Sequence, residues 1–136
     1  WGEGNSIRNN RFRLNGVQVA YEHTYFVVSG EYYEGFGSYD DLIISERTFR
    51  SVPHSGYSGF AEFREPKTGL GAWVRYDSQQ LDYSEPENSF NENRLIISAV
   101  WRFHKENKII LSYDKFYEGY ANLPSTIWEA TLDLRF

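Results

Sequence analysis

Apolar and polar side chains alternate without a break through Thr126-Ile127-Trp128-Glu129-Ala130-Thr131-Leu132-Asp133-Leu134-Arg135-Phe136. A period of two residues predicts a β-strand, whose successive side chains point to opposite faces. One face of this strand carries the apolar set from Trp128 to Phe136, and the other carries Glu129, Asp133 and Arg135. The strand is about as long as the roughly 9–11 residues that cross a bilayer at a tilt, whereas most globular strands have about 5–6.

The composition excludes several classes of protein. The chain contains no cysteine, so it has no disulfide, no thiolate metal ligand and no cysteine nucleophile. Its net charge of -5 disfavours binding to nucleic acid. It contains no run of about eighteen apolar residues that would form a membrane helix, and its mean hydropathy is -0.61. A transmembrane β-barrel needs no such run, because only alternate residues meet lipid.

The sequence begins at Trp1 and contains no methionine. We therefore expect a processed chain or a piece of a longer protein, because a primary translation product starts with methionine. The lack of a signal peptide at Trp1 is what a mature exported protein would show.

Seven strands are predicted from the period-two stretches that lie between turn residues. They cover residues 10–22, 25–33, 57–64, 70–77, 94–103, 108–116 and 126–136. The connections between them alternate between short and long, as in outer-membrane barrels with tight periplasmic turns and larger external loops. The short connection Glu65-Pro66-Lys67-Thr68-Gly69 offers a proline with a fixed φ and a glycine that accepts a positive φ.

Two kinds of β protein fit this alternation. A soluble barrel or sandwich turns its apolar side chains inward, and a transmembrane barrel turns them toward lipid. Aromatic residues near the strand ends favour the second kind, because membrane barrels carry aromatic girdles there. They include Tyr25, Phe26, Tyr32, Tyr33, Tyr57, Tyr76, Trp101, Phe103, Tyr113, Phe116, Trp128 and Phe136. We predict a lipid-facing set of Leu95, Ile97, Ala99, Trp101, Leu111, Tyr113, Ala130, Leu132 and Leu134.

The alternate residues of the same strands, which point to the opposite face, include many ionisable side chains. They are Glu22, Glu31, Glu62, Arg64, Arg75, Asp77, Arg94, Arg102, Lys108, Asp114, Glu129, Asp133 and Arg135. Such a set needs water or an internal network of ion pairs, because each unpaired buried charge costs several kcal/mol. We predict that these residues line a lumen. With six cations and seven carboxylates among them, the set does not establish a preference for anions.

The stretch from Trp128 to Phe136 resembles the C-terminal strand of bacterial outer-membrane β-barrels, which the barrel assembly machinery reads as a signal. The resemblance implies that Trp128, Leu132, Leu134 and Phe136 belong to this assembly signal. It also implies a bacterial outer-membrane location, in contact with outer-membrane lipid and lipopolysaccharide.

Most of the stretch 16–136 is similar to the phosphate-selective porin family. The resemblance lies in the hairpin from Gly16-Val17-Gln18-Val19-Ala20-Tyr21-Glu22 to Gly30-Glu31-Tyr32-Tyr33. It continues in Gly71-Ala72-Trp73-Val74-Arg75-Tyr76-Asp77 and in the hairpin of residues 94–114. The resemblance implies a barrel of about sixteen strands that is commonly trimeric. It implies passive diffusion of small solutes, with anions such as phosphate among them, and no cofactor.

The expected fold is therefore all-β, an antiparallel up-and-down transmembrane β-barrel, with residues 1–136 forming one segment of about seven strands. An odd number of strands predicts that this segment is the C-terminal part of a larger barrel. The alternative is a closed eight-stranded barrel with an additional strand at residues 7–14 and a hairpin at Asn15-Gly16. We do not prefer it, because Phe12 and Leu14 make too thin a lipid face.

Two classes of function remain, a porin channel and a small structural or binding barrel that serves as an anchor, adhesin or sheath for a partner protein. An enzyme is not expected, because His23 and His104 fall at short turns and His54 falls in the longest loop, so no Ser-His-acid set converges. No metal site is expected either. The candidate calcium ligands, which lack the spacing of a calcium loop, are Asp40, Asp41, Glu85, Glu87 and Glu92.

Overall fold

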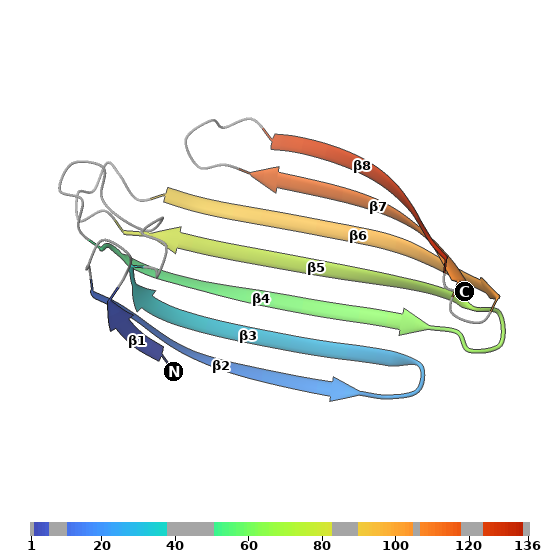
Figure 1. Ribbon diagram of the computed structural model, residues 1–136, viewed down its shortest axis with the longest axis horizontal. Coiled ribbons are helices and arrows are strands. Elements are labelled where there is room, and N and C mark those ends of the chain that lie inside the picture. Colours follow the sequence, from blue (N-terminus) through green and yellow to red (C-terminus); the bar gives the residue numbers. More distant parts are fainter. Residues whose placement is uncertain are drawn as a thin grey trace.

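The computed structural model describes residues 2–5, 11–37, 51–82, 90–104, 107–117 and 124–134. These residues form one antiparallel eight-stranded sheet in which every strand pairs with its neighbours in sequence (Figure 1). The strands are β1 (Gly2–Asn5), β2 (Arg11–Glu22), β3 (Phe26–Phe36), β4 (Pro53–Arg64), β5 (Leu70–Leu81), β6 (Phe90–His104), β7 (Asn107–Tyr117) and β8 (Pro124–Asp133). The all-β, antiparallel, up-and-down prediction is confirmed.

The seven predicted strands correspond to β2 through β8, and the short strand β1 is an addition. It pairs with the start of β2, from Gly2 opposite Leu14 to Asn5 opposite Arg11. The prediction placed several strand ends too early. The strand β5 continues to Leu81 through Ser78-Gln79-Gln80, because these polar residues pair in register with the start of β6.

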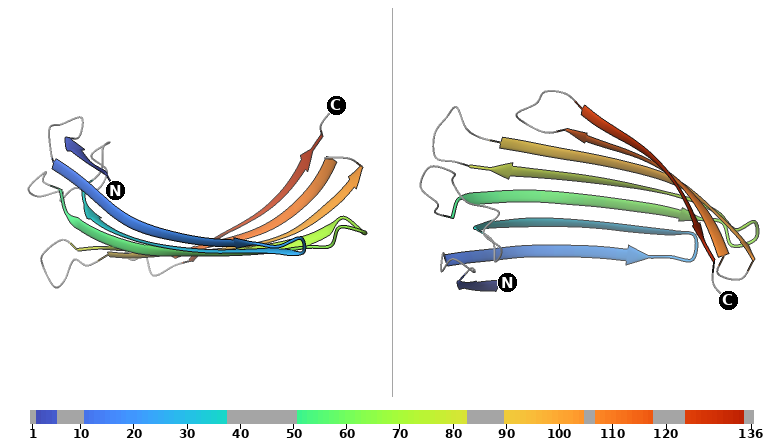
Figure 2. Two further views of the ribbon diagram at one scale, coloured as in Figure 1. Left: turned by 90° about the horizontal axis from the view of Figure 1, so that it is seen from below. Right: turned by 45° about the horizontal axis from the view of Figure 1, so that its top comes forward.

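The sheet is a single curved and twisted layer, and it does not close on itself within the described residues (Figure 2). Among the described residues no second layer covers the sheet, and few apolar side chains are buried. The buried apolar side chains of the described residues are Val52, Leu81 and Val100. None of the helices sought in the described part of the chain has the length and apolar character to cross a membrane.

The strand ends that the short turns join lie at one end of the sheet, and those that the longer connections join lie at the other (Figure 1). Between β2 and β3, His23 and Phe26 exchange backbone hydrogen bonds of 2.8 and 3.3 Å, which close a tight hairpin over Thr24 and Tyr25. Between β4 and β5, Gly69 adopts a φ of 72°, as its sequence position predicts. Its amide donates to the Glu65 carbonyl at 2.9 Å, which fixes this turn.

The Asn15-Gly16 hairpin does not form. Both residues lie inside β2, where Asn15 pairs with Glu34 and Gly16 pairs with Tyr33. A strand continues there because β3 offers an unbroken ladder of backbone partners from Val27 to Phe36. The preference for one long first strand over a hairpin at Asn15-Gly16 is therefore confirmed.

Candidate functional site: the charged face of the sheet

The register of the strands divides the side chains into two faces, because residues that pair across an antiparallel ladder point to the same side. One face, here called the charged face, contains Glu22, Glu31, Glu62, Arg64, Arg75, Asp77, Glu92, Arg94, Arg102, Lys108, Asp114, Glu129 and Asp133. Every lumen-facing residue predicted from sequence lies on this face, except Arg135, which is outside the described residues. Sequence reasoning missed Glu92 by treating it as a loop residue.

The other face, here called the apolar face, contains the predicted lipid-facing residues of β6, β7 and β8. In the register they are Leu95, Ile97, Ala99, Trp101, Leu111, Tyr113, Ala130 and Leu132. The assembly-signal residues Trp128 and Leu132 share this face. Leu134 follows the end of β8 with its side chain exposed, and Phe136 is outside the described residues.

The charged face is the concave one. In a curved sheet, side chains converge on the concave side and spread apart on the convex side. Ser98 and Val100 on the charged face are 1% and 6% exposed. On the apolar face, Val19 and Trp128 are 71% and 76% exposed. The sheet therefore turns its charges inward and presents its large apolar side chains outward.

A cluster of ion pairs surrounds Glu62 near the short-turn end of the charged face. Glu62 accepts from Arg64 Nη2 at 2.9 Å and from Arg102 Nη2 at 3.3 Å, so one carboxylate holds two guanidinium groups. Arg64 also donates to Glu22 at 2.9 Å across strand β3. Arg102 reaches Glu62 across β5, and a side chain at Gly71 would lie about 3.5 Å from its guanidinium, which is an ordinary van der Waals contact.

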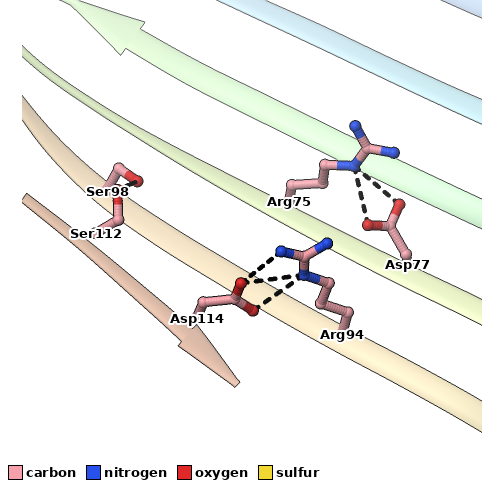
Figure 3. Close-up of polar contacts among 6 residues, drawn as sticks. All are labelled: Arg75, Asp77, Arg94, Ser98, Ser112 and Asp114. Atoms are coloured by element: carbon pink, nitrogen blue, oxygen red, sulfur yellow. Dashed lines mark hydrogen bonds and ion pairs between the residues drawn. The ribbon is translucent and has the colours of Figure 1, made fainter. Parts of the chain in front are cut away.

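Three further ion pairs lie on the same face, two of them drawn in Figure 3. The Nε of Arg75 donates to both carboxylate oxygens of Asp77 at 2.9 Å. Arg94 makes a two-nitrogen contact with Asp114 across the β6–β7 ladder, with its shortest distance 2.6 Å. The third pair joins Lys108 to Asp133 at 3.4 Å. The charged face is therefore organised by pairing as well as by solvation.

The centre of the charged face contains less polar contacts. Ser98 and Ser112 face each other across the ladder with their hydroxyls 2.8 Å apart (Figure 3). Trp73 pairs with Ser98 in the register and has its ring 6.0 Å from that of Phe60. The rings of Phe60 and Trp73 therefore share the face with the charges, which the alternation of side chains in β4 and β5 could have indicated.

Aromatic side chains border the apolar face toward both ends of the strands. Toward the long connections, Tyr32, Tyr57 and Tyr117 lie exposed in one register row. Nearer the middle of the strands, Tyr57 lies 6.0 Å from Tyr76 and Tyr113 lies 4.9 Å from Trp128, measured between ring centroids. Toward the short turns, Tyr21 and Phe26 have rings 5.9 Å apart, and so have Trp101 and Phe103 at 5.7 Å. The charges that the register places on this face all lie near the long connections. Among the residues whose side chains are described they are Arg11, Arg13, Glu34 and Lys115.

The three histidines come from separate elements. His54 lies in β4 and is buried, so the prediction that it belongs to a loop is wrong; β4 begins at Pro53 because β3 and β5 both offer it backbone partners. His23 lies in the β2–β3 turn, and His104 ends β6. Within the described residues, no cluster of histidine and carboxylate side chains fits a metal ion.

The candidate calcium ligands from the long connections are mostly outside the described residues. These are Asp40, Asp41, Glu85 and Glu87. Glu92 belongs to β6 and the charged face instead, because it pairs with Gln79 in the register.

Comparison with known proteins adds no relative. No protein-family model matches the chain, and neither a curated protein nor a solved structure matches it. The resemblance to phosphate-selective porins stays a prediction from the sequence. What the structure contributes is the separation of the two faces, the curvature that turns the charges inward, and the pairing of those charges.

Proposed function

We propose that this chain is part of the wall of a β-barrel in the bacterial outer membrane, and that the intact barrel is a porin through which small solutes diffuse in water. The observation that carries the proposal is the outward apolar face. It presents Val17, Val19, Leu111 and Leu132, all more than half exposed, and aromatic side chains border it toward both strand ends.

The placement of charged side chains on the concave side and apolar side chains on the convex side supports a membrane environment over a soluble one. A soluble barrel would fill its concave side with apolar side chains and expose polar ones. Here the concave side contains the ion pairs of Glu62, Asp77 and Asp114, which need water or one another for solvation. Lipid outside and water inside satisfy both faces at once.

The open edges of the sheet bear on the size of the barrel. In the described residues, β8 pairs only with β7, and β2 is covered by β1 only at its start. Unpaired backbone groups are not tolerated in lipid, so a membrane barrel must close. In this proposal further strands complete the wall. A water-filled lumen needs about sixteen strands, because about eight leave an interior filled by side chains.

Tryptophan fluorescence tests the assignment of the two faces. The intact protein would be prepared as single-tryptophan variants that keep Trp101, Trp128 or Trp73, and each would be reconstituted in vesicles with brominated acyl chains. Bromine quenches an indole in contact with lipid, so we expect strong quenching of Trp101 and Trp128. Trp73 lies on the charged face and serves as the internal control. Equal quenching of all three would contradict the proposal.

Conductance separates a porin from a structural barrel. The intact protein in a planar bilayer should give stable, step-like currents in KCl. Correct quenching together with no current would indicate a barrel without an open lumen. That outcome would favour the alternative function as an anchor, adhesin or sheath for a partner protein.

A further inference from the structure

The cations of the charged face are all engaged by carboxylates. The described cations on this face are Arg64, Arg75, Arg94, Arg102 and Lys108, and each forms an ion pair of 3.4 Å or less. Their partners are Glu22, Glu62, Asp77, Asp114 and Asp133. This paired set has as many negative as positive charges, so its field falls off quickly with distance from the wall.

Two carboxylates of the same face have no cationic partner among the described residues. Glu31 lies on β3 between two neutral cross-strand neighbours, Gln18 and Ser58. Glu129 lies on β8 opposite Ser112, and its one hydrogen bond comes from the Thr131 hydroxyl at 2.9 Å. Neither carboxylate forms an ion pair in the described part of the chain, and each acts on mobile ions over a Debye length of about 10 Å at 0.1 M salt.

From this asymmetry we infer that the segment makes the lumen attract cations, through the unpaired carboxylates Glu31 and Glu129. The inference rests on the proposed function, and it names the class of solute that this wall favours. It differs from the passage of anions such as phosphate that the sequence resemblance includes among the expected solutes. The arginines of this wall contribute little to selectivity for anions, because their charge is already neutralised by the carboxylates that they contact.

The position of the two carboxylates suits this role. Glu31 lies on β3 and Glu129 lies on β8, and the ion pairs of Asp77 and Asp114 lie on the strands between them. Together the two carboxylates extend the negative field across the described wall. Glu31 is half-buried and Glu129 is exposed on the charged face. Selectivity in wide pores follows the local placement of such charges rather than their total number.

The test is a reversal-potential measurement on the intact protein in a planar bilayer under a KCl gradient. The double variant Glu31→Gln, Glu129→Gln removes both unpaired charges with little change in shape. We expect its reversal potential to shift from that of the wild type toward the equilibrium potential of chloride. The unknown remainder of the wall is the same in both proteins, so the difference reports on these two side chains.

Two controls isolate the effect. Glu34→Gln removes one carboxylate from the same strand as Glu31 but on the apolar face, and it should leave the reversal potential unchanged. The double variant Arg94→Gln, Asp114→Asn removes a complete ion pair and should shift the potential less than removal of Glu31 and Glu129.

The outcomes distinguish the inference from the proposed function. An unchanged potential in the Glu31 and Glu129 variant, or a shift toward the potassium potential, would overturn the inference while the channel stands. A wild-type protein that reaches the bilayer and passes no current would overturn the channel, and the inference with it.

Discussion

The two faces of the sheet share one backbone and differ in almost every other respect. On the concave face, Glu62 holds two arginines and Ser98 is almost completely buried. On the convex face, Val19 and Trp128 have more than two thirds of their surface exposed. A chain with a low mean hydropathy can therefore present an apolar surface. Apolar and polar residues alternate along each strand, so the hydropathy of any sequence window is an average over the two faces.

The comparison extends to glycines of one strand. A side chain at Gly56 on the charged face would lie 2.5 Å from the Tyr33 ring and 2.7 Å from the Ser78 carbonyl. At Gly59 on the apolar face, a side chain would meet nothing within 4 Å. Curvature crowds one side of β4 and opens the other, so the same residue type has a steric role at one position and none at the other.

The largest expected effect comes from placing a charge on each face at neighbouring positions of β2. Val19→Arg puts a guanidinium on the outward face at a point between the aromatic borders, where it should destabilise the protein by about 2–4 kcal/mol in a bilayer. Gln18→Arg points to the charged face opposite Glu31 and should cost far less. The measurement is unfolding by denaturant in lipid vesicles. Equal losses at the two positions would contradict the assignment of the faces.

A smaller effect is expected from added methyl groups in β4. Gly56→Ala forces a shift of Tyr33 or of the backbone at Ser78 and should destabilise by about 1–3 kcal/mol. Gly59→Ala has open space and should be neutral or slightly stabilising, since alanine loses less backbone freedom than glycine. The free energies of unfolding of the two variants would be compared in the same vesicles. A larger loss at Gly59 would mean that the two sides of β4 are crowded in the opposite sense.

The smallest expected effect is the loss of the shared carboxylate. Glu62→Gln leaves Arg102 without its ion-pair partner, and we expect a loss of about 1 kcal/mol, because the side chains are partly solvated. The loss should shrink at high salt, which screens the remaining charges. Glu129→Gln serves as the control, since its glutamine can still accept from Thr131 and no ion pair is broken. Unfolding at low and at high salt measures both variants.

The alternation of apolar and polar residues was enough to predict which side chains share a face in most of the strands. The alternation in β6 and β8 assigned Ile97, Leu132 and Asp133 to their sides without knowledge of the register, because a strand has a fixed period of two. Pairs within one strand were also within reach of the sequence. Arg75 and Asp77 are two residues apart on one face and form an ion pair.

Contacts between strands were beyond the reach of the sequence. The pairing of Arg94 with Asp114 depends on how β6 and β7 are aligned, which the turn between them determines. The contact of Arg102 with Glu62 also depends on the alignment of β4, β5 and β6, because it crosses the strand between them. The C-terminal end of β5 was predicted too early for another reason. Polar residues such as Gln79 are typical of loops in a sequence, although here the backbone of Gln79 pairs with the neighbouring strand β6.

The strictly consecutive order of the strands has a consequence for how the sheet forms. Within the described sheet each strand pairs with the strand that precedes it, so no pairing in this sheet joins distant parts of the chain. The entropy lost in closing a loop grows only slowly with its length, by about 0.6 kcal/mol for each doubling. The hairpin of β2 and β3 closes over Thr24 and Tyr25, whereas β3 and β4 must close over residues 37–52. The sheet can thus grow at its edge one hairpin at a time, and the pairing of β4 with β3 is its slowest local step.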